Sequence, residues 1–501
     1  MANLPSPSRM APLFLRLLGV VYAIAFVSLW VQVQGLIGSR GILPIAPHLA
    51  EVALRFGPER YAWFPTLLWL GASDAALHAL CALGVIAAVL VVAGRLQTPA
   101  LVLAWAVYLS LTTAGRDFLA FQWDNLLLET GFLAVFLLPP RWRARPEPPS
   151  PVGLWLLRWL LFRLMFMSGV VKLASGDVSW RSLKALDFHF ETQPLPTVLG
   201  WYAHQLPGWV HAVAVLVMFV LELVLPFAIF GPRRWRNVAA AGIVALQAGI
   251  ALTGNYGFFN LLTAVLAVLL LEGEAKPAKG EEKPKGFARV WPWVAVPVAA
   301  VVAVISVVQL AGAFHFRPAW PRPVLVLYQA VAPFRTINGY GLFAVMTKER
   351  PEIVVEAAAT GRPGWPMIFV SNPANRRGGR VFARRTCRVS TGRCGSPRSV
   401  IRAATPGLKT FSHGSPKARR RCWVCSRKIL STMLLRNSCV RGSRIITSLI
   451  ATRSARREPG GGGRSEACIS LRCRRSSSER AEPGVRRATI ATLSTRAEEA
   501  K

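Results

Sequence analysis

Long apolar stretches separated by short polar connections run through the first 311 residues of the chain. A helix needs about 20 apolar residues to cross the hydrocarbon core of a bilayer, and nine stretches approach that length. They are residues 14–33, 75–93, 100–113, 118–138, 153–174, 209–230, 238–253, 258–271 and 290–311. The first stretch has no small-residue cleavage site and further spans follow it, so we expect a retained helix rather than a signal peptide. The pattern predicts an all-α polytopic membrane bundle with about nine transmembrane helices.

The basic residues in the connections predict the orientation of this bundle. Short cytoplasmic loops are enriched in Lys and Arg. If the N-terminus is cytoplasmic, the strongly basic connections all lie on that side: "RWRAR" at 141–145, "RRWR" at 233–236 and "KPAKGEEKPKG" at 276–286. The segments 35–65, 175–207 and everything after residue 312 then lie on the exported side.

The composition divides the chain into further parts. A charged linker with Pro and Gly, at 273–289, separates a bundle of about eight spans at 1–272 from a last transmembrane helix at 290–312. After this helix, a turn at Asn338-Gly339 and β-branched residues at 353–355 predict strands. We therefore expect the start of an exported β-rich C-terminal domain at 313–356, with the linker in the cytoplasm.

The last part of the chain, 357–501, has a different composition from the rest. It holds 32 Lys and Arg against six Asp and Glu, no Asp at all, and seven of the eight cysteines. Arg, Ser and Cys rise together, as they do when GC-rich coding sequence is read in a wrong frame. The frame can be shifted by joining the third base of each residue's codon to the first two bases of the next codon. In this shifted frame, "STGRCGSPRSV" at 390–400 can be read as DWQMWFAALG. We predict a basic tail that is disordered or non-native, produced by a frameshift near Ala357; the alternative is a genuine Arg-rich disordered tail.

This prediction changes how the net charge of +36 is interpreted. Such a charge would normally suggest a nucleic-acid partner, but most of it lies in the tail. Trp365 and Trp423 are the only tryptophans there, and the C-x-x-C of Cys422 and Cys425 has no second ligand pair nearby. We expect no nucleic-acid partner and no metal site, and the sequence predicts no cofactor.

The stretch at 118–138 carries polar residues that a lipid-facing helix would not tolerate. On one continuous helix, Gln122, Asn125 and Glu129 would share one side, and Asp117 and Asp124 another. An unpaired charge in the membrane core costs at least about 2.5 kcal/mol. The helix must therefore be interior, with partners for its charges.

The next stretch, at 153–174, supplies Arg158, Arg163 and Lys172. Glu129 and Arg163 lie at nearly the same number of residues from the outer ends of their stretches, so antiparallel neighbours would place them at the same depth. We expect them to form a buried ion pair that stabilises the bundle, with proton handling or substrate binding as the alternative. The candidates for buried polar or ion-pair roles are Asp124, Asn125, Glu129, Arg163 and Lys172.

The outer loop at 175–207 is rich in titratable and aromatic groups. Its candidates for contact with a client protein or substrate are Asp177, Trp180, Arg181, His189, Glu191, Trp201, Tyr202 and His204. His189 and Glu191 could act as an acid/base or metal-binding pair, but their spacing matches no strong metal motif. Aromatic residues at headgroup depth, or a docking surface for a partner, explain the composition better.

Five strings of the chain resemble the lipase maturation factor family of polytopic membrane proteins. They are "FQWDNLLLETGFLA", "FRLMFMSGVVKLASGD", "LDFHFETQPLPTVLGWYAHQLP", "LTGNYGFFNLLT" and "PFRTINGYGLFAVMT", within a resemblance that covers about residues 14–356. The resemblance implies a multi-pass membrane protein with a chaperone-like role in the maturation of exported lipases or related secreted proteins. It implies location in the bacterial cytoplasmic membrane, or in the endoplasmic reticulum of a eukaryote, with the C-terminal domain on the exported side.

The family is also distantly similar to vitamin K-dependent γ-carboxylase-like membrane proteins, which are enzymes. That similarity implies an alternative, a membrane-embedded enzyme acting on a lipid or quinone-like substrate, with Glu129, Arg163, Lys172 and His189 as its candidates. An enzyme should lose activity when Lys172 or His189 is replaced, even though the protein still folds. A maturation factor should be affected at these positions only through its stability.

Overall fold

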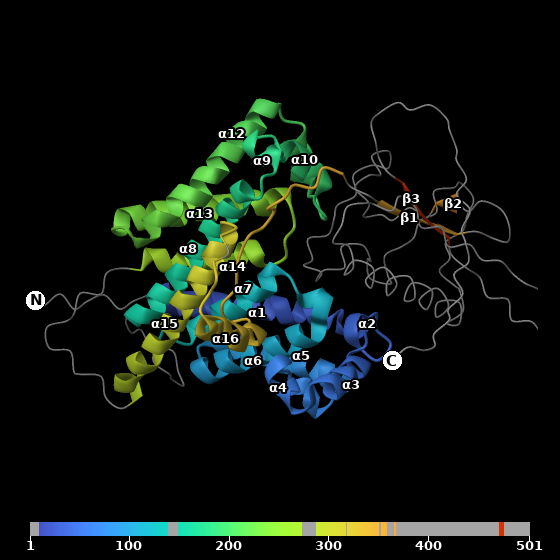
Figure 1. Cartoon of the computed structure of the whole chain (residues 1–501), viewed down its shortest axis with the longest axis vertical. Helices are drawn as coiled ribbons and strands as arrows, with labels where there is room; N and C mark the ends of the chain where they lie inside the picture. The colour runs from blue at the N-terminus through green and yellow to red at the C-terminus, as the bar shows by residue number, and fades with distance from the viewer. Residues whose placement is uncertain are drawn as a thin grey trace, which may run out of the picture.

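The computed structural model describes residues 10–138, 149–272, 287–316, 318–349, 352–357, 365–366 and 470–474, and the statements below concern these residues. They are mainly helical (Figure 1). Seven helical stretches are long and apolar enough to cross a bilayer: Met10–Trp30, Asp74–Ala93, Gln97–Leu119, Pro151–Ala174, Gly208–Phe230, Arg233–Thr253 and Val294–Ala313. A polytopic helical membrane bundle is thereby confirmed.

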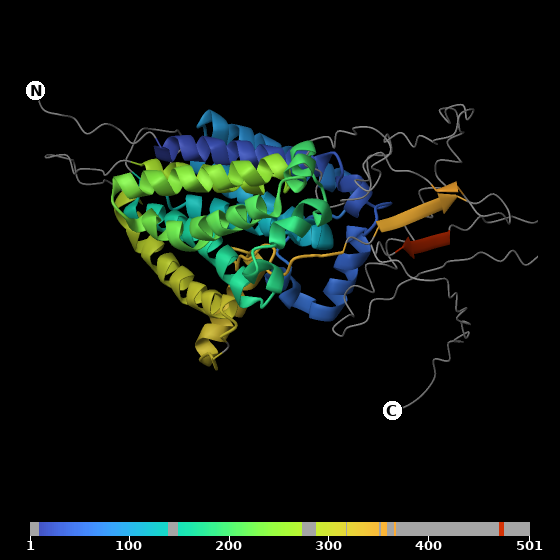
Figure 2. The same cartoon turned by 90° about the horizontal axis from the view of Figure 1, so that it is seen from above.

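Most of the long helices lie side by side along one direction, whereas the last of them runs obliquely to the others (Figure 2). The long helices are α1 (Met10–Trp30), α5 (Asp74–Ala93), α6 (Gln97–Gly115), α7 (Gln122–Ala134), α8 (Pro151–Ala174), α12 (Gly208–Phe219), α13 (Arg233–Thr253), α14 (Phe259–Ala267) and α15 (Phe287–Ala313). Shorter helices lie in the connections: α2 (Val33–Ile37), α3 (Ile45–Phe56), α4 (Arg60–Trp63), α9 (Val178–Arg181), α10 (Ala185–Thr192) and α11 (Val198–His204). The short 3₁₀ and π segments are η1 (Gly57–Glu59), η2 (Leu67–Leu70), η3 (Arg116–Leu119), η4 (Val220–Val224), η5 (Leu225–Phe230), η6 (Val268–Leu271) and η7 (Ala332–Phe334).

The core follows from the apolar faces of these helices. In α1, Phe14, Leu18, Tyr22 and Phe26 are spaced four residues apart and are fully buried, so they form one face. This side of the bundle continues through α5 and α6, which pack in succession. The helix α8 is central, since it contacts α7, α14, α15 and the η4 and η5 turns that follow α12.

Two of the nine expected spans form helices shorter than a bilayer crossing requires. The stretch expected at 118–138 is interrupted, because η3 ends at Leu119 and α7 begins only at Gln122. Asp124 accepts a hydrogen bond from the backbone N–H of Phe121 at 3.3 Å, which satisfies a free donor at the start of α7. The stretch expected at 258–271 forms a short apolar helix, Phe259–Leu271. The number of spans therefore remains a prediction.

The apolar stretch after α11 changes its helical type half-way along. Pro226 has no N–H to donate and its ring disfavours a regular helix, and the turn before it, η4, is a π turn. A π turn inserts an extra residue and moves side chains out of the regular helical register. Glu222 lies in this turn and is buried.

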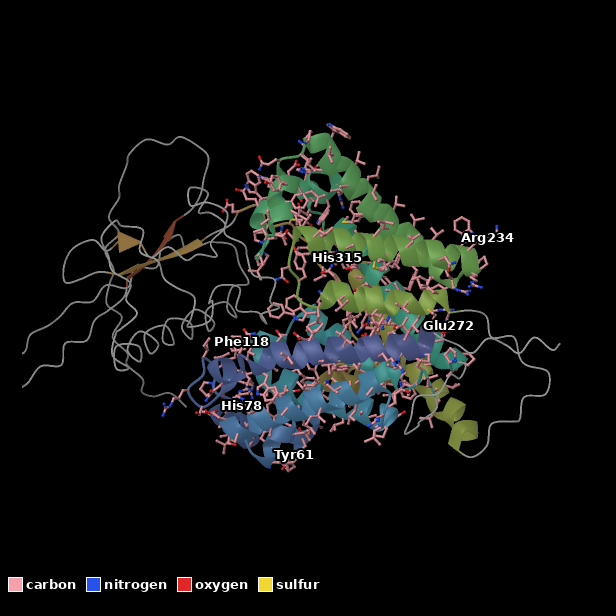
Figure 3. The ribbon with its side chains drawn as sticks, turned by 180° about the vertical axis from the view of Figure 1, so that it is seen from behind. Tyr61, His78, Phe118, Arg234, Glu272 and His315 are labelled. Atoms are coloured by element: carbon pink, nitrogen blue, oxygen red, sulfur yellow. The ribbon has the colours of Figure 1, made fainter. Side chains whose placement is uncertain are left out.

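The two ends of the bundle differ in charge and in structure. In Figure 3, Arg234 and Glu272 lie at one end, and Phe118 and His78 at the other. At the first end, which we call the basic end, Arg158 and Arg236 donate to the carbonyl groups that end the η6 turn, those of Leu269 and Leu270, at 3.1 and 3.4 Å. The opposite end carries α9 to α11, and we call it the α10 end.

The segment after α15 differs from the β-rich start expected at 313–356. It contains the helix α16 (Arg322–Val331) and the η7 turn, and then an irregular segment, 335–349, that packs against the bundle. The expected strand at 353–355 is present in β1 (Glu352–Ala357), which pairs antiparallel with β2 (Trp365–Pro366) and β3 (Ser470–Arg474). Apart from Ala357 at the end of β1, and β2 and β3, the predicted out-of-frame tail lies outside the described residues. The charged linker up to residue 286 and the C-x-x-C pair also lie outside them.

Candidate functional site

Glu129 on α7 and Arg163 on α8 form an ion pair in the interior of the bundle. Both side chains are fully buried, and Nη2 of Arg163 donates to Oε1 of Glu129. The two helices are antiparallel neighbours in contact. The two residues lie at nearly equal numbers of residues from the outer ends of their stretches, so the contact occurs at the depth predicted from the sequence. Neither charge is left without a partner, as a membrane interior requires.

The other oxygen of Glu129 binds a distant part of the chain. Oε2 accepts from the backbone N–H of Asn338 at 2.8 Å, from its side-chain amide at 3.1 Å and from the Tyr340 hydroxyl at 2.7 Å. Nη1 of Arg163 donates to the carbonyl of Asn338 at 3.0 Å and to Gln309 of α15 at 3.2 Å. The ion pair therefore fixes the segment 335–341 inside the bundle.

Asp124 and Asn125 of α7 bind different partners, one on α6 and one in the segment after η7. Asp124 is fully buried and accepts from the Tyr108 hydroxyl of α6 at 2.6 Å. Asn125 accepts from Arg335 at 3.2 Å through its side chain. Asp117, expected to share a side with Asp124, is exposed, because it lies on η3 before α7 begins.

Lys172 has a carboxylate partner that the sequence analysis missed. Its Nζ lies 2.8 and 2.7 Å from the two oxygens of Glu222, and it also donates to the carbonyl of Ser168 at 3.2 Å. The Trp180 ring lies 5.5 Å from the same nitrogen. A Cβ at Gly169, one turn before Lys172, would lie 2.6 Å from a methyl of Leu223, so the glycine allows the π turn to approach α8 closely.

Asp177 joins the outer loop to the segment that follows residue 335. It accepts from the backbone N–H of Ser179 at 2.9 Å, which starts α9, and from the backbone N–H of Met346 at 2.6 Å. Burial alone would raise the pKa of Asp177, but these donors, the Ser179 hydroxyl and the Lys348 ammonium hold it below its usual value. Trp180 is buried and donates to the carbonyl of Phe343 at 2.9 Å.

His189 of α10 lies in a partly buried polar cluster at the same end. Its Nε2 is 3.2 Å from the Tyr256 hydroxyl, which donates to Gln193 at 3.0 Å. Burial, and secondly the Lys172 ammonium, lower the pKa of His189 to about 4. The ring is therefore neutral at pH 7 and acts as a structural hydrogen-bonding group.

The remaining outer-loop candidates are exposed or partly exposed. Arg181 and Glu191 are exposed, and His204 approaches Glu191 at 3.9 Å. Trp201 and Tyr202 project from α11, 54% and 52% exposed, with ring centroids 5.0 Å apart. They belong to a larger set of exposed apolar side chains that we call the α11 surface: Val198, Leu199, Trp201, Tyr202, Leu206 and Trp209.

The sequence of this bundle matches one family of known proteins. The profile of the lipase maturation factor transmembrane domain matches residues 9–277, which is more than half of the chain. The chain belongs to the lipase maturation factor family.

Curated relatives of this family support the assignment. Lipase maturation factor 2 of Gallus gallus is 45% identical over 303 residues, covering 57% of this chain and 42% of that protein. The human protein of the same name is 41% identical over 329 residues, with coverages of 61% and 46%. Lipase maturation factor 1 of Bos taurus is 33% identical over 387 residues, with coverages of 70% and 67%. This chain thus spans less than half the length of the two lipase maturation factor 2 relatives, and no solved structure matches it.

Three residues of this candidate site were not singled out from the sequence. Glu222 is the one carboxylate in the apolar stretch 208–230, and pairing it with the unmatched Lys172 could have found it. Asn338 and Tyr340 lie in "RTINGYG", which looks like a soluble loop. Nothing in its pattern indicates that it returns to a carboxylate more than 200 positions earlier in the chain.

Proposed function

We propose that this protein is a membrane-bound maturation factor, which assists the folding or assembly of exported lipases or related secreted proteins. One observation carries the proposal. The bonds from Glu129 and Asp177 hold the segment 335–348 against the bundle, so the chain continues toward β1 from the same end that carries the α11 surface. A client bound to the α11 surface would then lie at the end of the bundle from which the chain continues.

The proposed orientation puts the α10 end on the exported side of the membrane. Arg95 lies in the connection between α5 and α6, and Arg233, Arg234 and Arg236 lie in the first turn of α13, all at the opposite end. Basic residues at the ends of spans are retained on the cytoplasmic side. The preferred membrane is the bacterial cytoplasmic membrane, and in a eukaryote it is that of the endoplasmic reticulum. Reporter fusions after Arg236 should report the cytoplasm and fusions after Gln205 the exported side; a cytoplasmic signal after Gln205 would contradict this orientation.

The α11 surface has the composition of a protein-binding patch. Large exposed apolar side chains are bordered by the polar groups of Glu191 and His204. An apolar centre with a polar rim is typical of protein interfaces, where Trp and Tyr contribute much of the binding energy. A partly folded lipase, which still exposes apolar surface, is a partner of matching chemistry.

The enzyme alternative receives no support from the comparisons. Two of its candidate groups, Lys172 and His189, have structural partners in Glu222 and Tyr256. Replacement of His189 by Gln separates the hypotheses, because an enzyme would lose turnover in a folded protein. In a maturation factor, the effect of the His189→Gln variant on its clients, divided by the amount of folded protein, would equal that of the wild type.

Deletion of the gene, followed by complementation, tests the proposed function. The quantity to measure is the specific activity of each secreted lipase, meaning activity divided by lipase mass. We expect deletion to lower specific activity more than secreted mass, and the full chain to restore it. Unchanged specific activity of all secreted lipases would contradict the proposal.

A further inference from the structure

The connection between α1 and α5 carries a group of exposed apolar side chains. Leu54 and Leu70 are 90% and 91% exposed, and Tyr61, Trp63 and Leu67 are between 41% and 55% exposed. Single exposed apolar residues are common on protein surfaces, but a group of them in one segment marks a site of contact with protein or membrane. The described part of the chain therefore leaves these five side chains without a cover.

The helix α3 of this connection has three sides of different character. One side is buried, and it consists of Ile45, Leu49 and Val52. A second side is apolar and exposed, with residues spaced four apart, and it consists of Ala46, Ala50 and Leu54. The third side is charged and exposed, and it consists of Glu51 and Arg55. An exposed apolar side next to a charged one is the pattern of a helix that lies at a membrane surface.

Hydrogen bonds to α6 fix the depth of the η2 turn in the bundle. The Thr66 hydroxyl donates to the carbonyl of Ser110 at 3.1 Å, and the backbone N–H of Leu67 donates to the Ser110 hydroxyl at 2.8 Å. Ser110 is buried, and it precedes Gly115, where α6 ends at the α10 end of the bundle. At about 1.5 Å of rise per residue, these bonds lie about 7 Å inside the end of α6. Interfacial helices bury their apolar side to a depth of about 5 to 10 Å.

The aromatic residues beside η2 have the composition of a membrane interface. The Arg60 guanidinium lies 4.6 Å from the centre of the Tyr61 ring and 5.3 Å from that of Trp69, and it donates to the Tyr61 hydroxyl at 2.8 Å. Trp and Tyr are enriched where acyl chains meet headgroups, because their rings are apolar and their tips are polar. Figure 3 shows Tyr61 at the outer edge of the bundle, where lipid surrounds the spans.

The direction of this connection agrees with its depth. In Figure 2, the blue helices that follow α1 run across the direction of the spans, at the α10 end. An element that runs across the spans at this depth lies in the plane of the membrane, within the leaflet that surrounds the ends of α5 and α6. Its exposed apolar side chains then face lipid rather than water.

We propose that the segment 45–70 is a membrane-interface element, whose exposed apolar side chains contact the lipids of the leaflet at the α10 end. Leu54, Leu67 and Leu70 contact the acyl chains, and the rings of Tyr61 and Trp63 lie at the level of the headgroups. The charged side of α3 faces water. The segment is therefore embedded in the leaflet, and only part of the connection between α1 and α5 is a loop in water. This proposal holds whichever side of the membrane the α10 end faces.

Spin labels on the full chain in lipid bilayers test this proposal. With the native cysteines replaced by Ser or Ala, a nitroxide is attached to each of the variants Leu54→Cys, Leu70→Cys, Arg55→Cys and Ile86→Cys. The accessibility of the label to oxygen, which concentrates in the hydrocarbon, is divided by its accessibility to a water-soluble nickel chelate. We expect a higher ratio at Leu54 and Leu70 than at Arg55, shifted toward the ratio at Ile86, which is 57% exposed within α5.

Two results would overturn the proposal. Equal ratios at Leu54, Leu70 and Arg55 would place the segment in water. Low accessibility of Leu54 and Leu70 to both reagents would show a cover of protein, from another part of the chain, a client or a second copy.

A second measurement keeps the native cysteines and covers the case in which their replacement prevents folding. A benzophenone amino acid replaces Leu70, or Arg55 as the control, and the full chain is irradiated in membranes. We expect mass spectrometry to find a phospholipid attached at Leu70 and none at Arg55. Cross-links at Leu70 that are confined to protein, or no cross-link there, would contradict a lipid partner.

Discussion

Asn338 donates both its backbone N–H and its side-chain amide to one oxygen of Glu129, although the two residues are 209 positions apart in the chain. The other oxygen of Glu129 is bound by Arg163. One carboxylate therefore joins α7, α8 and the segment after η7. Because β1 follows this segment, the bundle controls where the rest of the chain begins.

Glu129→Gln should strongly destabilise the protein. The variant removes the charge that compensates the buried Arg163 guanidinium, and loss of one partner of a buried pair typically costs about 3 to 5 kcal/mol. Thermal unfolding in detergent, followed by size-exclusion chromatography, measures the effect. Glu59→Gln is the control, because Glu59 is exposed on η1. Equal thermal stability of the two variants would show that the ion pair does not stabilise the bundle.

Lys172→Met should also destabilise the protein by about 3 to 5 kcal/mol, because Glu222 stays buried without its partner. The double variant with Glu222→Met should be more stable than the single one, since replacing a whole buried pair by apolar residues is often nearly neutral. The measurement is a double-mutant cycle on unfolding temperature. Additive losses in the double variant would mean that the two side chains are not coupled.

Acidification should destabilise the α10 end through His189. The pKa of this histidine is about 4 in the folded protein and about 6.5 when unfolded, so the unfolded state binds more protons between these values. The stability is fully present above pH 6.5 and falls as the pH drops to 4, by up to about 3 kcal/mol.

The pH dependence is measured on the wild type and on His189→Gln, which has no proton to bind there. A smaller loss of stability from pH 7 to pH 5 is expected for the variant. The same loss in both proteins would assign the effect to another group, such as His48, whose pKa is also lowered, by burial and by Arg116.

The reading frame near Ala357 is open to a direct test. We expect resequencing of the gene to find a one-base deletion there, because the composition changes abruptly after Glu356. With the frame restored, the translation should contain DWQMWFAALG in place of residues 390–400. A tryptic peptide of the purified protein that ends at Arg398 would contradict this prediction.

The depth of charges could be predicted from the sequence, but the contacts of irregular segments could not. Glu129 and Arg163 lie on regular helices, where counting residues gives depth. The side assigned to Asp117 was wrong because the helix was assumed to be continuous through Ala120. Glu222 was missed because a π turn sets its direction, and Asn338 because its position depends on a returning loop rather than on a periodic pattern.

The specific activity of a secreted lipase, measured with variants of the α11 surface, tests the central claim most directly. Trp201→Ala combined with Tyr202→Ala removes two exposed rings at the α10 end, and Trp235→Ala removes one at the basic end, where the ring is 56% exposed. At equal amounts of folded protein, we expect the first variant to lower lipase specific activity toward that of the deletion strain. The Trp235 variant should match the wild type. Full specific activity with the Trp201 and Tyr202 variant would contradict the claim that clients are matured at this surface.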